Sequence, residues 1–583
     1  MCSSCLGIFS PSKQRSISSI IRCWCDITTR SGVAKSENLS RRQLLTALLG
    51  GQFAHSVGCG RSTLPPAGEL SHTRFDLGHL LRDGVEKSVS PDAYKDVGVT
   101  IVGGGIAGLA AAWRFKRAGF DDFVLAELEE NPGGTARGGR RNGFKFPWGA
   151  HYIPVPMPEN QALIQLLSEM QVIEGLSEDG RPVVSEQFLC REPEERVFND
   201  GQWYEGLYPS HGASEEDLLQ LAAFRAEMDR WAEMRDASGR RMFAIPMELG
   251  SDDESVRKLD QMSMEQWLNE RGWNSPRLRW LVDYSCRDDY GLPPDRVSAW
   301  AGVFYFAARI ARAGQESQEV ITWPEGNGRV VDYLKDVADD QIQTGLGVFE
   351  VKAGTNTELA QVAALDTKTR RPVGYRSEQV VFAAPQMMAK YLIHGFSESG
   401  RDSTGFRYGS WLVANVHVKE RPENAGFPMA WDNVIRDSRS LGYVTATHQS
   451  GVDHGPTVLT WYYPFADVDA VITRKQMLNL KWADWVDVVL TDLRRAHPDI
   501  DALVTRVDVM CWGHAMVQPL PGFVWSPERE QASRPLGPIH FAGTDLSGVA
   551  LLEEAFFHGV RAAEEILAVR GILDQPLVDI RNG

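Results

Sequence analysis

Three glycines and one carboxylate have the residue types and spacing of a dinucleotide-binding turn. Gly103, Gly105 and Gly108 form the pattern Gly-x-Gly-x-x-Gly, and Glu127 follows about 20 residues later. In such a turn the first glycine permits a tight bend, the second lets the backbone approach a pyrophosphate, and the third allows a helix to pack closely on a strand. The carboxylate accepts hydrogen bonds from ribose hydroxyls. The chemistry that this stretch offers is therefore the binding of a dinucleotide.

The residues around the glycines predict the elements that would hold such a turn. The apolar residues of 97–102 predict a buried parallel strand, and apolar residues recur at helical spacing from Ile106 to Trp113. A second strand over 123–127 ends at the carboxylate. An ordinary strand–helix–strand unit with a glycine-rich turn is the alternative that the glycines alone leave open.

Two later stretches indicate which dinucleotide is bound. Gly133-Gly134 follow the acidic residue, and Gly149-Ala150 come after an aromatic-rich strand. This arrangement resembles the long fingerprint of the amine oxidase, protoporphyrinogen oxidase and phytoene desaturase superfamily, whose Gly-Gly passes the pyrophosphate of FAD and whose Gly-Ala lies against the flavin. The resemblance implies FAD rather than free NAD. That family usually has Arg directly after Gly-Gly, whereas this chain has Thr135 there and Arg137 two residues later.

Further segments extend the resemblance over about 97–565. The strand that ends at Val351 corresponds to the one that meets the adenine edge. The run Ala542-Gly543-Thr544-Asp545 leads from a strand into a helix of small residues, and it resembles the closing motif whose helix N-terminus faces the flavin pyrimidine. By this resemblance the predicted cofactor-binding residues are Gly103, Gly105, Ile106, Ala107, Gly108, Glu127, Gly134, Arg137, Gly149, Ala150, Val351, Gly543, Thr544, Asp545 and Leu551.

The sequence predicts an α/β protein with an interrupted, Rossmann-like FAD-binding domain and a second, α+β substrate domain. Residues 156–322 are mostly helical in pattern, and residues 411–512 contain β-rich stretches separated by turns. The predicted boundaries are an N-terminal extension at 1–60, a linker at 61–96, an FAD-binding domain at 97–155, 323–392 and 530–570, and a substrate domain at 156–322 and 393–529.

Composition limits the class of protein. The 583 residues carry 61 basic and 77 acidic side chains, a formal charge of −16, and no basic stripe interleaved with aromatics. Nucleic-acid binding, which needs clustered Lys and Arg, is therefore disfavoured. No run of 18 apolar residues predicts a transmembrane span. Cysteines are too scattered for a disulfide scaffold, and no metal site is expected.

The N-terminal residues have a separate character. Ser40-Arg41-Arg42 precede a short apolar stretch, which resembles a twin-arginine export signal. The resemblance implies export machinery as a partner and a periplasmic location, with lipid attachment at Cys59 left open. The alternative is a basic amphipathic helix on a cytoplasmic protein. The oligomeric state cannot be predicted.

The chemistry implied by the resemblance is transfer of a hydride from a substrate C–H bond to flavin N5, with no side-chain nucleophile. His151 and Tyr152 directly follow the flavin-side Gly-Ala and are the candidate catalytic residues. Tyr462, Trp512 and His514 are expected in the substrate cavity, together with Tyr463. Many amine oxidases of the family have a Lys at the strand that here reads 409–413, and an aromatic residue where this chain has Leu551.

These departures leave three hypotheses open. The first is an FAD-dependent oxidoreductase that removes a hydride from a C–N or C–C centre of a small molecule. The second is a desaturase or isomerase that acts on an apolar isoprenoid-like or tetrapyrrole substrate. The third, from another class, is a non-catalytic flavin-binding protein that serves a partner.

Overall fold

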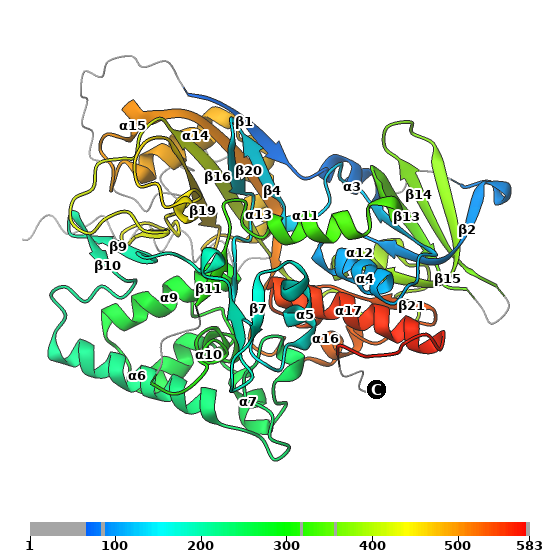
Figure 1. Cartoon of the computed structure of the whole chain (residues 1–583), viewed down its shortest axis with the longest axis horizontal. Helices are drawn as coiled ribbons and strands as arrows, with labels where there is room; N and C mark the ends of the chain where they lie inside the picture. The colour runs from blue at the N-terminus through cyan, green and yellow to red at the C-terminus, as the bar shows by residue number, and fades with distance from the viewer. Residues whose placement is uncertain (1–65, 83–87, 315–318, 355–357, 579–583) are drawn as a thin grey trace, which may run out of the picture. The chain divides into compact units, whose positions relative to one another are not determined.

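A computed structural model describes residues 66–82, 88–314, 319–354 and 358–578, which all belong to one compact unit, His55–Gly583. The arginine pair of the predicted export signal and Cys59 lie outside the described residues. Two large sheets with flanking helices form this unit (Figure 1). The predicted fold class, a Rossmann-like domain with a second α+β domain, is confirmed.

The first sheet has seven strands and contains the glycine motif at the end of its central strand. Its order is β12-β3-β2-β15-β14-β13, with β21 beside β15. β2 pairs in parallel with β3 and β15, whereas β13, β14 and β15 form an antiparallel extension. The bounds are β2 Tyr94–Val102, β3 Phe123–Glu127, β12 Ile342–Thr344, β13 Leu346–Lys352, β14 Ala360–Asp366, β15 Pro372–Phe382 and β21 Ile539–Phe541. Val99, Ile101 and Val102 at the end of β2 are almost fully buried, which explains the hydrophobic pattern there.

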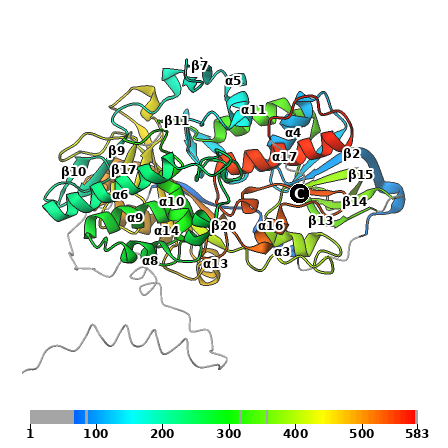
Figure 2. The same ribbon diagram turned by 90° about the horizontal axis from the view of Figure 1, so that it is seen from below.

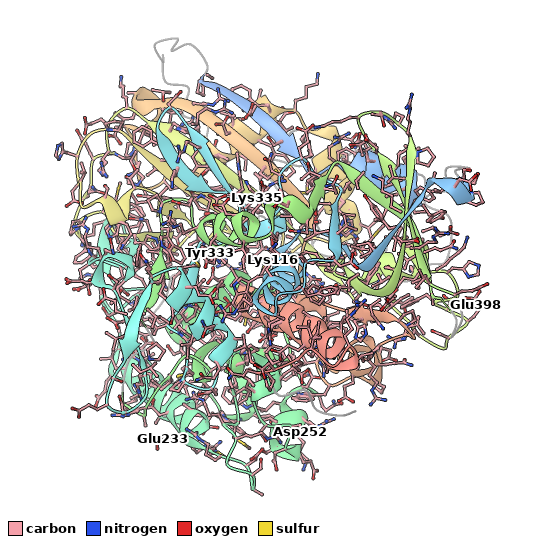
Figure 3. The ribbon with its side chains drawn as sticks, turned by 45° about the vertical axis from the view of Figure 1, so that its right-hand side comes forward. Lys116, Glu233, Asp252, Tyr333, Lys335 and Glu398 are labelled. Carbon is pink, nitrogen blue, oxygen red and sulfur yellow. The ribbon has the colours of Figure 1, made fainter. Side chains whose placement is uncertain are left out.

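Helices α4 (Ile106–Arg117) and α17 (Leu552–Val569) lie side by side over this sheet, although 434 residues lie between the end of α4 and the start of α17. A Cβ at Gly559 of α17 would lie 2.2 Å from the carbonyl oxygen of Ala107, so only glycine permits this approach. α11 (Gly328–Val337) packs against α4, and Figure 3 shows Lys116 of α4 near Tyr333 and Lys335 of α11. The two ends of the chain's FAD-related sequence thus meet in one helical layer.

The second sheet has eight strands in the order β1-β20-β16-β19-β18-β17-β9-β10. Its bounds are β1 Ala67–His72, β9 Glu195–Asn199, β10 Gln202–Glu205, β16 Tyr408–Val418, β17 Asp432–Ile435, β18 Tyr443–Thr445, β19 Thr457–Pro464 and β20 Val504–Val517. β16 is buried on both faces along its whole length. It is an interior strand of this sheet, and Figure 1 shows it between β19 and β20.

Residues 61–96 are not a simple linker, contrary to the sequence prediction. They contain β1, helix α3 (Phe75–Arg82) and the start of β2. β1 pairs in parallel with β20, Ala67 opposite Arg506 through His72 opposite Cys511. A short edge strand whose partner lies more than 400 residues away has no local alternation or turn that sequence patterns could reveal.

A helical layer lies against the second sheet and contributes to the substrate side. It comprises α6 Glu215–Glu233, α7 Glu254–Leu259, α8 Met264–Glu270, α9 Pro276–Tyr290 and α10 Ala299–Ala307 (Figure 2). The remaining helices are α5 Gln161–Glu169, α12 Gln386–Leu392, α13 Ala470–Asn479, α14 Trp482–Leu493, α15 Ile500–Leu503 and α16 Pro527–Ala532. Three small two-stranded antiparallel sheets pair β4 Gly138–Arg141 with β5 Phe144–Pro147, β6 Tyr152–Pro154 with β11 Val320–Thr322, and β7 Ile173–Leu176 with β8 Pro182–Val184. No helix among the described residues is long and apolar enough to cross a bilayer.

Candidate active site

A cavity of about 740 Å³ runs from the glycine motif to the second sheet. Its walls come from the carboxyl ends of β2 and β3, the first turn of α4, the start of α17, and the strands β16, β19 and β20. Such a position, beyond the carboxyl ends of parallel strands, is where α/β sheets bind nucleotides. The volume is within the range of cofactor and substrate pockets, which is about 300–1,000 Å³.

Each of the three motif glycines is required for a different geometric reason. Gly103 has φ +104°, and a Cβ there would lie 2.9 Å from the carbonyl oxygen of Ala383. A Cβ at Gly108 would lie 1.9 Å from the carbonyl oxygen of Gly103, so this glycine allows the helix to pack on the turn. At Gly105 a Cβ would meet no protein atom within 4 Å and would project from the cavity wall. The second glycine therefore leaves room that a bound pyrophosphate can use.

Glu127 lies at the cavity wall and is fixed by two backbone N–H groups. Gly104 donates to its Oε2 over 2.6 Å, and Glu129 donates to its Oε1 over 2.7 Å. Burial raises the pKa of Glu127, while these two hydrogen bonds lower it. Each carboxylate oxygen has lone pairs left over for a ribose hydroxyl.

The predicted flavin-side residues also line the cavity. Gly149 must lack a side chain because a Cβ would lie 2.2 Å from the carbonyl oxygen of Thr135. Gly543 has φ +141° with open space beside it. Asp545 accepts hydrogen bonds from the Gln386 amide (2.7 Å) and the Tyr408 hydroxyl (2.5 Å), and burial raises its pKa. The cofactor-binding candidates on the wall are Gly103, Gly105, Ile106, Ala107, Glu127, Gly134, Gly149, Ala150, Gly543, Thr544, Asp545 and Leu551.

Three predicted cofactor residues do not line the cavity. Gly108 is the packing glycine described above. Arg137 places its guanidinium 5.0 Å from the ring centre of Trp512, and 3.8 Å from Glu129 Oε2, which holds it against β20. Val351 is fully buried in the core beneath β13. Val348 of the same strand lines the cavity.

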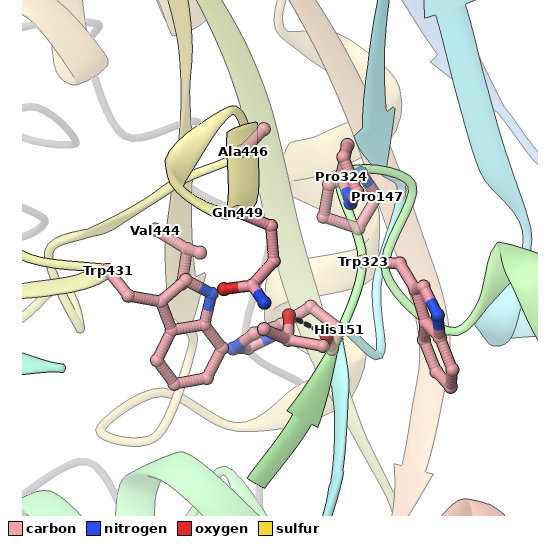
Figure 4. Close-up of a pocket in the computed structure, with 9 residues that line it drawn as sticks. Pro147, His151, Trp323, Pro324, Trp431, Val444, Ala446 and Gln449 are labelled. Atoms are coloured by element: carbon pink, nitrogen blue, oxygen red, sulfur yellow. Dashed lines mark hydrogen bonds between the residues drawn. The ribbon is translucent and has the colours of Figure 1, made fainter. Parts of the chain in front are cut away.

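His151 and Tyr152 both lie on the cavity wall, but neither is an effective base at neutral pH. Burial lowers the pKa of His151 to about 4, and raises the pKa of Tyr152 well above its usual value of 10. The imidazole of His151 stacks on Tyr462 with ring centres 4.8 Å apart. Figure 4 shows its other surroundings, where Trp431 and Gln449 enclose a space of only about 10 Å³, the size of one water molecule.

A cluster of charged side chains near Tyr152 was not predicted from the sequence. We use the name acidic cluster for Asp288, Asp289 and Glu553, which line the cavity beside Arg309. Arg309 donates to Asp289 over 2.7 Å, and the charges of all four groups act on Tyr152. The signal that could have identified the cluster is a pair of adjacent carboxylates in the last turn of α9, where the helix dipole disfavours negative charge.

Burial raises the pKa values of the carboxyl groups in the acidic cluster. Burial and the neighbouring Asp289 raise the pKa of Asp288 to about 7, and burial raises the pKa of Glu553 to about 7. Within the described residues the Asp288 carboxylate accepts no hydrogen bond. This carboxylate is therefore available to a ligand.

Aromatic side chains form the walls between the acidic cluster and the flavin-side strand. Tyr462 donates its hydroxyl proton to the carbonyl of Gly149 over 2.9 Å, and Trp512 donates its indole N–H to the carbonyl of Trp148 over 2.7 Å. Trp411 stands on the strand that lacks the family lysine, and its indole N–H has no partner among the described residues. The cavity is also lined by His514, but not by Tyr463, which alternates to the other face of β19.

The comparisons with known proteins agree with this site. Residues 106–567 match the family model "Flavin containing amine oxidoreductase". A relative from Mycobacterium tuberculosis (strain ATCC 25618 / H37Rv), named "Putative flavin-containing monoamine oxidase AofH", is 28% identical over 497 residues, which are 81% of this chain and 97% of the relative.

Solved structures share the fold at lower identity. Putrescine oxidase bound to putrescine has a TM-score of 0.60 at 18% identity and covers 82% of this chain and 100% of its own. Cyclohexylamine oxidase from Brevibacterium oxydans IH-35A has a TM-score of 0.54 at 16% identity, covering 82% and 98%. A fatty acid isomerase from P. acnes that produces CLA has a TM-score of 0.55 at 13% identity, covering 83% and 99%.

The residues around the cavity fit the cofactor that the family model implies. The open space at Gly105 and Gly543 and the fixed carboxylate of Glu127 match a nucleotide, and the cofactor is FAD. The protein is an FAD-dependent oxidoreductase. The chain belongs to the family of flavin-containing amine oxidoreductases.

Proposed function

We propose that the protein oxidises a primary or secondary amine whose ammonium group enters the cavity at the acidic cluster. The observation that carries this proposal is the placement of Asp288 and Glu553 in the same cavity as the aromatic side chains of Trp411 and Tyr462. With all groups ionised, three carboxylates face one Arg309, a net charge of −2 (three negative, one positive). A cationic substrate would pair with buried carboxylates of this kind, whereas an anionic substrate would be repelled by them.

Hydride transfer requires the amine to be neutral, so a group in the cavity must take the ammonium proton. Bound FAD supplies the hydride acceptor, N5 of the flavin. A carboxylate with a pKa of about 7, as at Asp288 or Glu553, can receive a proton at its Oδ or Oε atom. The buried aromatic walls exclude water and hold the C–H bond in place. Tyr152 and His151 then serve as walls and neutral hydrogen-bonding groups rather than as bases.

An isomerase or desaturase acting on an apolar substrate is the second candidate. It is favoured by the apolar side chains of Leu441 and Leu551 on the wall and by the absence of lysine in 409–413. The acidic cluster weighs against it, because a fatty acid or isoprenoid brings no positive charge to three carboxylates.

Anaerobic rapid mixing tests this proposal on the purified holoprotein. The panel contains primary and secondary amines, amino acids, porphyrinogens and carotenoid precursors, and the signal is loss of the oxidised flavin absorbance. Amines are expected to bleach the flavin, with return of the colour in air. Bleaching by an apolar compound alone would overturn amine oxidation and favour the second candidate.

We also propose that the protein is exported through the twin-arginine route. Support comes from Ser40-Arg41-Arg42 and the apolar stretch after it, and from the fact that this route carries proteins folded around a cofactor. Fractionation of a bacterial host should place the flavin-loaded protein in the periplasm, and Arg41→Lys with Arg42→Lys should keep it in the cytoplasm. Equal distribution of both proteins would refute export. Mass measurement of Cys59→Ala against the parent chain tests lipid attachment.

A further inference from the structure

The segment β1–α3, residues 67–82, precedes the family match, which begins at residue 106, yet it borders the cavity. Phe75, Gly78, His79 and Arg82 stand on the wall together with Glu127 and Val348 of the nucleotide side. Figure 1 shows α3 between β20 and β13, where the two sheets approach each other. A part of the chain outside the shared family region thus completes the site.

We propose that α3 covers the adenosine diphosphate half of FAD and retains the cofactor. This inference concerns cofactor binding and does not depend on which substrate is oxidised. Its position follows from three contacts: the pairing of β1 with β20, a hydrogen bond at Arg74, and apolar packing on β13.

The hydrogen bond ties the start of α3 to the carboxylate that is predicted to hold the ribose. The Arg74 amide donates to Glu129 Oε1 over 2.7 Å, and the Glu129 amide donates to Glu127 Oε1 over 2.7 Å. The Gly104 amide completes the chain at Glu127 Oε2. Only two hydrogen bonds therefore separate the start of α3 from the nucleotide carboxylate, which places the helix at the adenosine end.

Packing fixes the opposite end of the same helix. Leu77 and Leu81 are four residues apart, lie on one face and are buried. A Cβ at Gly347 of β13 would lie 2.5 Å from Leu81 Cδ1, so this glycine lets α3 lie directly on the strand. The other face of α3 holds Gly78, where a Cβ would meet no protein atom within 4 Å. That open face borders the cavity, while Leu80 on the outer face does not.

The charges near α3 suit the anionic diphosphate. The described lysines and arginines on the cavity wall are Arg74, Arg82, Lys390 and Arg309. Arg309 pairs with Asp289 at the substrate end. Arg74 and Arg82 come from the start and end of α3, where Arg74 Nε lies 3.5 Å from Asp76 Oδ1, and Lys390 comes from α12, which contacts α3. Since Arg137 is held against Trp512, these residues supply positive charge that the Gly-Gly segment does not.

A pair of variants of the full chain tests this role. Gly78→Trp places a large side chain in the open space beside the cavity, and Leu80→Trp adds a comparable side chain to the outer face of the same helix. We expect Gly78→Trp to lower the flavin-to-protein ratio and to release FAD about tenfold faster in mild chaotrope, which corresponds to about 1.4 kcal/mol. Leu80→Trp is expected to match the parent. Equal flavin retention in both variants would overturn the proposal.

A second pair keeps the test decisive if Gly78→Trp does not fold. His79→Glu adds a negative charge at the cavity wall, and His79→Gln is the neutral control. Titration of the apoprotein with ADP, followed by calorimetry, should show weaker binding for His79→Glu, with a difference that shrinks at high salt. Identical ADP affinity for the two variants would place α3 away from the diphosphate. Neither readout involves turnover. The proposal for α3 can therefore hold even if amine oxidation fails, and amine oxidation can hold even if the proposal for α3 fails.

Discussion

Replacing Asp288 by Asn removes one proton acceptor from the cavity wall with almost no change in volume. In the proposed reaction this carboxylate contacts the substrate ammonium and receives its proton. A hydrogen bond to a charged group contributes about 1.5–3 kcal/mol, so its loss should lower kcat/KM for an amine about 10- to 150-fold. The effect should appear in kcat/KM, because that constant reports the stabilisation of the transition state relative to free enzyme and free substrate.

The size of the effect should depend on pH in a defined direction. Burial and Asp289 raise the pKa of Asp288 to about 7. Well above that pH the parent carboxylate is ionised and the Asn variant is not, so the ratio of parent to variant kcat/KM is largest. Well below that pH the parent carboxyl is protonated and cannot accept the ammonium proton. The ratio should therefore fall toward one as the pH decreases through about 7.

The assay is anaerobic flavin reduction by an amine that the panel identifies, measured over the pH range in which both proteins keep their flavin. Asp283→Asn is the matched control, since Asp283 lies on the same helix α9 but pairs with Arg287 outside the cavity. A ratio of parent to Asp288→Asn that stays constant with pH would refute the assignment of the proton to Asp288. An equal loss in the Asp283 control would indicate a structural effect.

Three further outcomes follow from the structure. Gly105→Leu should fold but purify with little flavin, because its side chain enters space that the protein leaves open; a full flavin content would contradict the glycine geometry. Arg137→Ala should keep its flavin, and its unfolding free energy should fall by about 0.5–1 kcal/mol because the contact with Trp512 is lost. A flavin-free product would instead indicate that Arg137 binds the phosphate. Arg114→Ala should lower the unfolding free energy by about 3–5 kcal/mol, because the buried carboxylate of Glu564 loses its charged partner and keeps only the amide hydrogen bonds from Leu577 and Val578. Urea titration measures the last two, and a loss below about 1 kcal/mol in Arg114→Ala would contradict the cost assigned to breaking this buried ion pair.

The nucleotide half of the site was predictable because its chemistry is local. Gly103, Gly105 and Gly108 lie within six residues, and each has a conformational requirement that the sequence shows directly. The cofactor contact at Val351 stays a prediction, because burial of its side chain does not exclude a contact through the backbone of β13.

The substrate half was less predictable because it is assembled from distant segments. Asp288 lies on α9, Glu553 on α17 and Arg309 in the turn after α10, and only the fold brings them beside Tyr152. Sequence proximity favoured His151 and Tyr152 as catalytic groups, but burial shifts the pKa of each away from the range in which it could act as a base. Desolvation depends on tertiary packing, and no spacing rule contains that information.

The distribution of charge along the cavity connects the two proposals. Arg74, Arg82 and Lys390 stand where the diphosphate is expected, and the acidic cluster stands beyond the aromatic wall. One continuous cavity can hold an anionic cofactor and a cationic substrate only if opposite charges are kept at opposite ends, since like charges would otherwise raise the energy of both ligands. The segment β1–α3 supplies part of the positive end and is attached to the substrate sheet through β20. The second sheet therefore positions, through β1, part of the positive charge that faces FAD, and it also forms the wall of the substrate cavity. We expect cofactor retention and the geometry of the amine site to depend on each other for this reason.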